Sequence, residues 1–129
     1  MSLLSPFLDE LAKPDGQGRD WYAWAANQTG HAFLGVMVAG IPLVLGAPVW
    51  AALVVVAVLA GAKEGRDFVA VPTLDTLMDN VNDFFFWMVG GVLAVALAGG
   101  LAGTFGITLA VGGAMLFPGV IQRFLKASV

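Results

Sequence analysis

The stretch KEGRDFVAVPTLDTLMDNVNDFFFWMVGG, residues 63–91, lies between long apolar runs and holds five of the nine acidic residues of the chain. Asp75, Asp79 and Asp83 recur every four residues, so on a helix they form one acidic stripe. Carboxylates stacked at this spacing repel each other unless a cation or a proton lies among them. The chain then continues as FFFWMVGGVLAVALAGG, which belongs in lipid or in a packed core. A polar stripe that leads into an apolar helix is costly and needs a physical explanation.

The composition of the whole chain favours an integral membrane protein. Of the 129 residues, 59% are hydrophobic and 12% are charged, and the mean hydropathy is +0.87. Soluble domains carry about twice that charged fraction, and a soluble fold of this size could not bury so much apolar surface. The net charge of −3 argues against a nucleic-acid partner. The absence of cysteine excludes disulfides, thiolate metal sites and a cysteine nucleophile.

The apolar runs predict an all-α integral membrane four-helix bundle made of two antiparallel hairpins. The expected spans are residues 20–45, 48–63, 73–98 and 101–122. Most approach the roughly 20 residues that cross a bilayer, whereas the second is short. Glycine and proline at 46–48 and glycines at 99–103 mark the turns within the hairpins. Apolar residues at helical spacing within 1–13 predict a short amphipathic helix at the membrane interface.

The distribution of basic residues predicts an inner-membrane protein with both termini in the cytoplasm. All six lie in the N-terminal segment, in the connection between the second and third spans, or in the C-terminal tail: Lys13, Arg19, Lys63, Arg66, Arg123 and Lys126. The turns near 46–48 and 99–103 have none. Since cytoplasmic loops carry the excess of Lys and Arg, the charged segments should share one membrane face and the bare turns the other.

The first span carries polar side chains deep within its apolar run. Asn27, His31 and Gly35 are spaced four residues apart and share one helix face. His31 lies about 15 Å along the helix from Trp21, a depth at which an unpaired polar group is costly. We therefore expect His31 to face the bundle interior and to have a partner there. A histidine at the interface, or one satisfied by a backbone carbonyl, would explain the same residue without a function.

The polar residues predict one site near the cytoplasmic side of the membrane. Its candidate members are Asn27, His31, Glu64, Asp79 and Asp83. A histidine with carboxylates is a reasonable set for a divalent metal, with His31, Glu64 and Asp79 as candidate ligands. The same groups could instead share protons. No other cofactor is expected, since the chain has no HExxH, GxSxG, CxxC or glycine-rich phosphate loop.

Part of the central stretch has a simpler interpretation. Asp75 fits the first turn of a helix that Thr73 caps, where the helix dipole favours a carboxylate. Lys63 and Arg66 could anchor the second span to lipid headgroups, in which case Glu64 belongs to a solvated helix end. These alternatives make the stretch an ordinary interfacial loop up to Asp75.

Glycines mark the expected helix contacts. Gly90 and Gly91 on the third span, and Gly103 and Gly106 on the fourth, are predicted packing positions, because small residues let helix backbones approach closely in membranes. The fourth span has no ionisable residue before Arg123. Its small-residue face should therefore pack against the other helices or form an oligomer interface.

The order of the polar residues resembles that of the small VanZ-like and YfiM-like membrane proteins. The resemblance covers residues 20–91 and rests on Asp20, Asn27, His31 and Gly35, then Lys63, Glu64, Arg66 and Asp67, then Asp75, Asp79, Asn80, Asn82, Asp83 and Gly90. Trp21 stands where that family commonly has lysine, and the interval from Arg66 to Asp79 is longer than in the family pattern. The resemblance implies a polar intramembrane site for an envelope or lipid-linked substrate.

Several functions fit these features, and the sequence does not decide whether a reaction is catalysed. The first is binding of, or action on, an envelope or lipid-linked ligand at the polar cluster. The second is an accessory or structural subunit of a larger membrane complex. The third is a holin-like pore of bacterial or phage type, in which a homo-oligomer would line its lumen with the polar residues. Transport of a small ion through a proton-coupled site is a further alternative. All four place the chain in a lipid bilayer.

Overall fold

The computed structural model describes residues 21–127, which form four α-helices and no strand. The helices are α2 (Trp21–Val44), α3 (Val49–Ala70), α4 (Leu74–Ala98) and α5 (Ala102–Ala127). The all-α prediction is confirmed for this part of the chain. The interfacial helix expected for residues 1–13 lies outside the described residues.

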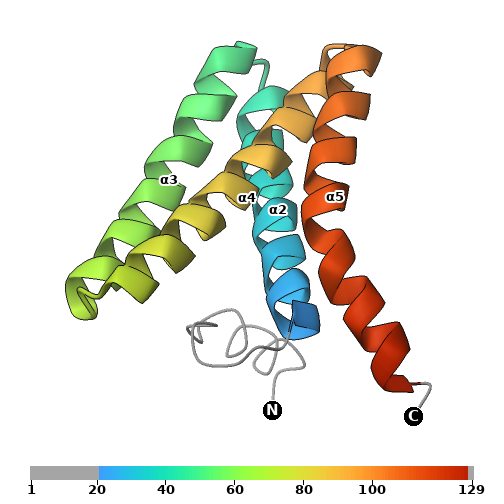
Figure 1. Ribbon diagram of the computed structural model, residues 1–129. Coiled ribbons are helices and arrows are strands. Elements are labelled where there is room, and N and C mark those ends of the chain that lie inside the picture. Colours follow the sequence, from blue (N-terminus) through green and yellow to red (C-terminus); the bar gives the residue numbers. More distant parts are fainter. Residues whose placement is uncertain (1–20, 128–129) are drawn as a thin grey trace, which may run out of the picture.

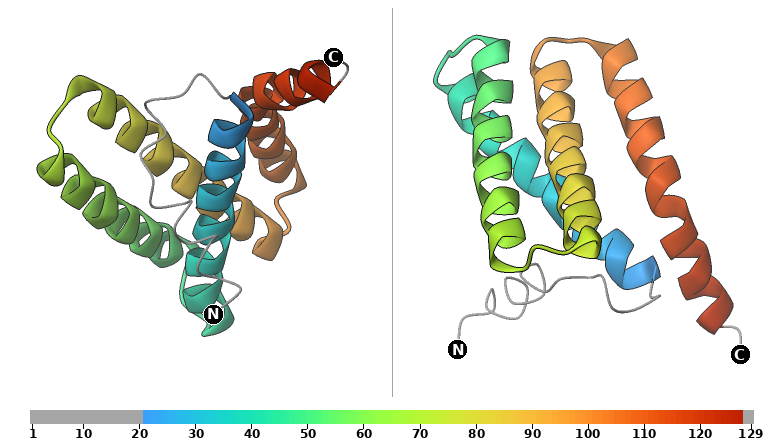
Figure 2. Two further views of the ribbon diagram at one scale, coloured as in Figure 1. Left: turned by 90° about the horizontal axis from the view of Figure 1, so that it is seen from below. Right: turned by 60° about the vertical axis from the view of Figure 1, so that its left-hand side comes forward.

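The helices α2 and α4 form the centre of the bundle and share its most extensive contact. The outer helices α3 and α5 lie on opposite sides of this pair, and each contacts both central helices (Figures 1 and 2). The α2–α3 and α4–α5 turns lie together at one end of the bundle (Figure 1). The α3–α4 connection lies at the other end of the bundle, the end at which α2 begins and α5 finishes (Figure 1). This second end is termed the polar end below.

Local backbone chemistry explains where the hairpin turns and α4 begin. Gly46 and Gly100 have φ values of 80° and 66°, which residues with a side chain rarely adopt, and each closes one hairpin turn. The Thr73 hydroxyl accepts a hydrogen bond from the Thr76 amide at 3.1 Å. Thr73 is therefore the N-cap of α4, as the sequence predicts.

Helix α3 is longer than the span predicted for residues 48–63, because it continues to Ala70. The added residues begin with a polar turn, Glu64 to Asp67. Lys63 pairs with Asp67 one turn later at 3.3 Å, a spacing that supports helix. The helix ends before Pro72, since proline disfavours helical backbone in the residue that precedes it. Glu64 consequently lies inside a continuous helix and not at a frayed end.

The central helices cross with their backbones in contact at two glycines. A Cβ atom on Gly35 of α2 would collide with the backbone carbonyl of Trp87, and one on Gly90 of α4 would collide with that of Ala32. In the same region, a Cβ on Gly91 would lie 3.2 Å from a methyl carbon of Val56 in α3. Gly90 and Gly91 therefore lie at close helix contacts, which is the role the sequence predicts for them.

The two glycines predicted to pack on α5 do not do so within the described chain. A Cβ atom added to Gly103 or Gly106 would have no atom of another described helix within 4 Å, whereas one on Gly112 would lie 3.3 Å from Val89 of α4. Gly112 follows Gly103 by nine residues (112 − 103), about two and a half turns at 3.6 residues per turn. Gly103 and Gly112 consequently lie on opposite sides of α5, and Gly112 marks the side that faces the bundle.

Much apolar surface remains outside the small core, which centres on Ala39, Ala52, Val56, Ala60, Trp87 and Val95. Large exposed hydrophobic side chains occur on every helix, among them Phe33, Trp50, Leu97 and Ile107. Of the described helices, only α4 is long and apolar enough to cross a membrane, with a mean hydropathy of 1.7. The apolar part of α5, Ala102–Phe117, is shorter. Core helices of soluble proteins also meet this criterion, so the four membrane spans stay a prediction.

Candidate functional site

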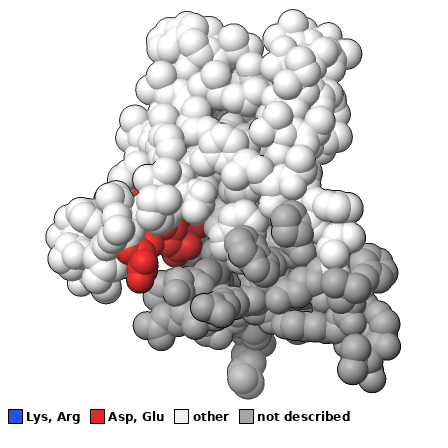
Figure 3. All heavy atoms as spheres, in the orientation of Figure 1, with Lys and Arg blue, Asp and Glu red and all other residues white. Residues whose placement is uncertain are grey.

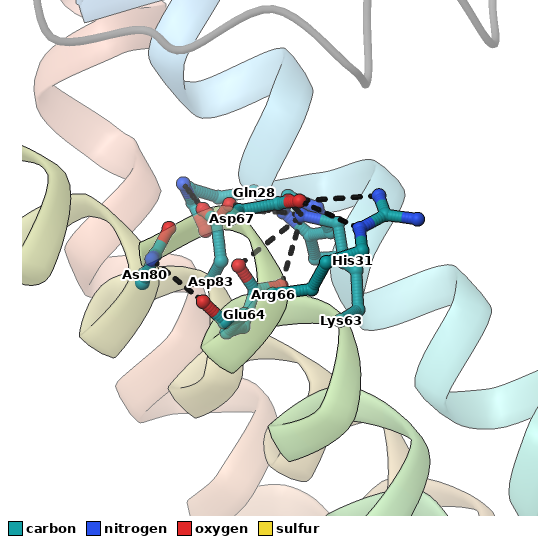
Figure 4. Close-up of polar contacts among 8 residues, drawn as sticks. All are labelled: Gln28, His31, Lys63, Glu64, Arg66, Asp67, Asn80 and Asp83. Atoms are coloured by element: carbon teal, nitrogen blue, oxygen red, sulfur yellow. Dashed lines mark hydrogen bonds and ion pairs between the residues drawn. The ribbon is translucent and has the colours of Figure 1, made fainter. Parts of the chain in front are cut away.

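Three buried ionisable side chains from three different helices meet toward the polar end of the bundle. His31 comes from α2, Glu64 from α3 and Asp83 from α4, and they are only 1%, 5% and 4% exposed. One ligand atom from each lies within 4.8 Å of the other two. Figure 4 shows these side chains pointing toward one another between the three helices. They are termed the His31–Glu64–Asp83 centre.

The carboxylate of Asp83 is held by α2. Gln28 Nε2 donates a hydrogen bond of 2.7 Å to Asp83 Oδ1. His31 Nδ1 lies 3.3 Å from the same oxygen, but the angle is not that of a hydrogen bond, and neither ring nitrogen has a hydrogen-bond partner among the described residues. The ring of Trp87 stacks on the imidazole, with centroids 6.2 Å apart. The imidazole is therefore positioned by packing while both of its nitrogens remain unsatisfied.

The carboxylate of Glu64 faces the ammonium of its neighbour Lys63. Lys63 Nζ lies 3.0 Å from Oε1 and donates a hydrogen bond of 3.2 Å to Oε2. Oε1 is close to the ammonium but lacks hydrogen-bond geometry. Asn80 Nδ2 donates a bond of 2.8 Å to the backbone carbonyl of Glu64 and so ties α4 to α3 beside the centre.

The same ammonium reaches the second carboxylate of the centre. Lys63 Nζ lies 3.7 Å from Asp83 Oδ2 and 3.3 Å from Asp67 Oδ2. One cation therefore stands beside three carboxylates, two of which are buried. Buried charges persist only when they are paired and hydrogen-bonded, and an unsatisfied buried polar group costs about 1–3 kcal/mol. The centre has more negative charge and more acceptor atoms than Lys63 alone satisfies.

The structure brings together three of the five predicted site residues. Asn27 is buried, and its Oδ1 has no hydrogen-bond partner among residues 21–127, but it is outside the three-residue centre. Asp79 is only partly buried and does not join the centre. Asp83 takes the place predicted for Asp79 in the candidate metal set. The reason is depth, since Asp79 lies one turn nearer the start of α4, about 6 Å along the helix axis.

Three residues that support the centre were not among its predicted members: Gln28, Trp87 and Asn80, of which Asn80 appears only in the family resemblance. Helical spacing could have identified them. Gln28 precedes His31 by three residues, Asn80 precedes Asp83 by three, and Trp87 follows Asp83 by four. Side chains at these spacings are neighbours on a helix surface. A search for polar or aromatic residues one turn from each candidate ligand would have found all three.

The donor set of the centre is suited to a divalent metal ion. It offers one imidazole nitrogen and two carboxylates, and the buried acceptor atoms without hydrogen bonds belong to two of the three residues. Three protein ligands also leave open coordination positions for water or a further ligand. Helix α5 supplies no ligand of this kind, because its sequence contains no histidine, aspartate or glutamate.

Comparison with known proteins gave no match to a family model, to a curated protein or to a solved structure. The resemblance to VanZ-like and YfiM-like proteins therefore stays a prediction that rests on the residues quoted above.

Proposed function

We propose that this chain is a membrane-embedded helical bundle that binds a divalent metal ion at the His31–Glu64–Asp83 centre, close to one face of the bilayer. One observation carries the proposal: an imidazole and two carboxylates, each more than nine-tenths buried, converge to within 4.8 Å. An apolar bundle keeps ionisable groups at such a position when they have a function or a compensating partner. A bound cation would satisfy the carboxylates and the unpartnered imidazole together.

The donor atoms favour Mn²⁺, Fe²⁺ or Zn²⁺ over other common ions. Imidazole with carboxylate suits these metals, whereas Ca²⁺ and Mg²⁺ prefer sites made of oxygen atoms alone. Soft ions such as Cu⁺ select thiolates, and the chain has no cysteine. Open coordination positions would let a phosphate oxygen of an envelope or lipid-linked ligand bind the metal directly.

The distribution of surface residues supports the membrane part of the proposal. Figure 3 shows acidic side chains gathered near the polar end on one face, while the upper part of that face carries no charge. Exposed hydrophobic side chains cover the rest of the bundle, for example Val54 and Val58 on α3 and Leu109 on α5. Lys63 and Arg66 lie at the polar end, and by the positive-inside rule this supports our proposal that the end faces the cytoplasm at an inner membrane.

The geometry favours a binding centre over a holin-like pore. In a pore, the polar residues would line a lumen shared between copies of the chain. In this structure His31, Glu64 and Asp83 meet within one copy.

A role as a subunit of a larger membrane complex is the second candidate, because the side of α5 with Gly103 and Gly106 is open within the described chain. Small residues on an open helix face allow a partner helix to pack closely. Purification with a stoichiometric membrane partner, lost on Gly106→Leu, would support this role. A chain that purifies alone from native membranes in mild detergent would argue against it.

Membrane insertion is tested by fractionation of cells that express the chain. We expect it to remain in the membrane pellet after an alkaline carbonate wash and to be released only by detergent, because every described helix exposes large hydrophobic side chains. Recovery in the soluble fraction as a monodisperse protein would overturn the membrane part of the proposal.

Metal binding is tested on the detergent-purified chain after removal of bound metal with a chelator. We expect one Mn²⁺ or Zn²⁺ per chain, and at least about 100-fold weaker binding in Asp83→Asn, since even residues that only support a metal ligand change affinity by about 10–100-fold. Asp75→Asn is the matched control, because it makes the same change at an exposed position of the same helix. Equal weakening in both variants would show that the metal responds to net charge and not to the centre.

A further inference from the structure

Lys63 lies where an incoming metal ion would compete with it. Its Nζ atom is 3.0 Å and 3.2 Å from the two oxygens of Glu64, and 3.7 Å from Asp83 Oδ2. Both carboxylates of the centre thus already face one cation. A divalent ion beside the same oxygens would be repelled by the ammonium, because like charges at this separation are unfavourable.

We propose that Lys63 is a built-in competitor of the metal ion, and that a metal binds the centre by displacing the Lys63 ammonium toward Asp67. This inference rests on the proposed metal binding and adds a mechanism that regulates the affinity of that same site.

Bond lengths support exchange over simultaneous occupation. A metal ion holds carboxylate oxygens at about 2.0–2.2 Å, whereas the ammonium holds those of Glu64 at 3.0 Å or more. The ligand atoms of the centre are spread over distances of up to 4.8 Å, wider than the ~3.4 Å between donors around a tetrahedral metal. Metal binding would therefore draw the ligands together, and an ammonium that stayed between Glu64 and Asp83 would stand close to the divalent charge and be repelled by it.

Asp67 gives the displaced ammonium another partner. Lys63 Nζ is already 3.3 Å from Asp67 Oδ2, and the two residues are one turn apart on α3. The Lys63 side chain is 28% exposed, so its head can move toward the surface while it keeps this pair. Displacement therefore removes the ammonium from Glu64 and Asp83 but leaves it paired with Asp67.

Removal of the competing charge tests the inference. In Lys63→Met, which keeps a long side chain but no charge, we expect Mn²⁺ or Zn²⁺ to bind about tenfold more tightly or better, in keeping with the coupling measured between close charge pairs. Arg66→Met is the matched control, since Arg66 contacts Asp67 at 3.1 Å but neither carboxylate of the centre. Its metal affinity should stay within about twofold of the parent chain.

Asp67→Asn provides an independent test through a double-mutant cycle. Asp67 lies outside the centre, yet its replacement should weaken metal binding several-fold because the displaced ammonium loses its second partner. In the Lys63→Met background the same change should have almost no effect. A structural or purely long-range electrostatic role of Asp67 would produce the same weakening in both backgrounds.

The outcomes separate this inference from the proposed function. Unchanged or weaker metal binding in Lys63→Met, with normal binding by the parent chain, overturns the inference alone. Failure of the parent chain and of Lys63→Met to bind either metal overturns the proposed function. Circular dichroism and size-exclusion chromatography check that each variant is folded. If Lys63→Met is not folded, Lys63→Gln removes the same charge with a polar side chain and the same criteria apply.

Discussion

Replacement of Gly90 by alanine is expected to destabilise the bundle by about 3 kcal/mol, the upper end of the usual range for overpacking. The added Cβ would collide with the backbone carbonyl of Ala32. A long side chain could swing away from such a contact, but a carbonyl inside α2 moves only if the helix moves. The two central helices would have to separate, and their contact is the most extensive of the fold. Unfolding in a denaturing detergent, followed by circular dichroism, measures this effect.

Gly106→Ala and Gly113→Ala are the matched controls for this prediction, since no atom of another described helix lies within 4 Å of a Cβ at either position. Alanine has a higher helix propensity than glycine by about 1 kcal/mol, so both controls should be neutral or slightly more stable than the parent chain. A Gly90→Ala variant that unfolds together with these controls would contradict the close crossing of α2 and α4.

Addition of Mn²⁺ or Zn²⁺ is expected to raise the free energy of unfolding, by about 2.7 kcal/mol at a free concentration about 100 times the dissociation constant. The reason is that the three ligands come from three helices, so the complete site exists only in the folded chain. A chelator should reverse the gain. Denaturant titrations with and without metal measure it.

In Glu64→Gln this metal-dependent gain should disappear, because the amide is a poor ligand and only two members of the centre remain. Asp75→Asn should retain the full gain, since Asp75 is exposed and outside the centre. Equal stabilisation of Glu64→Gln and the parent chain by metal would place the bound ion elsewhere on the protein.

The sequence predicts the number and order of the four described helices well because its strongest signals are local. Glycine and proline near 46–48 and glycines near 99–103 mark turns that the backbone needs, and Thr73 is recognisable as an N-cap. The span predicted for residues 48–63 stops at Lys63 because charged residues resemble the end of a membrane segment, whereas the helix itself runs further. Pairing one turn apart lets those residues continue the helix to Ala70.

The sequence predicts the site less completely, because periodicity shows which residues share a face but not how each helix is rotated or shifted against its neighbours. Asp79 and Asp83 share a stripe, and only their depth along α4 distinguishes the residue that reaches the centre. Likewise, Gly103 and Gly112 are both plausible packing residues of α5, and tertiary contact selects Gly112. Such relative positions are set by contacts between helices far apart in the sequence.

The close crossing of α2 and α4 at Gly35 and Gly90 affects which ligands of the centre can adjust to an ion. Trp87 contacts Gly35 through its backbone and His31 through its ring. The same residue therefore packs at the helix crossing and positions the imidazole. The close crossing of α2 and α4 therefore fixes the relative positions of His31 and Asp83. The hydrogen bond from Gln28 to Asp83 joins the two helices further. No glycine of α3 makes such a backbone contact with another described helix. Adjustment of the site to the size of an ion would therefore fall on the Glu64 side chain, because the Asn80 hydrogen bond ties the backbone of Glu64 to α4.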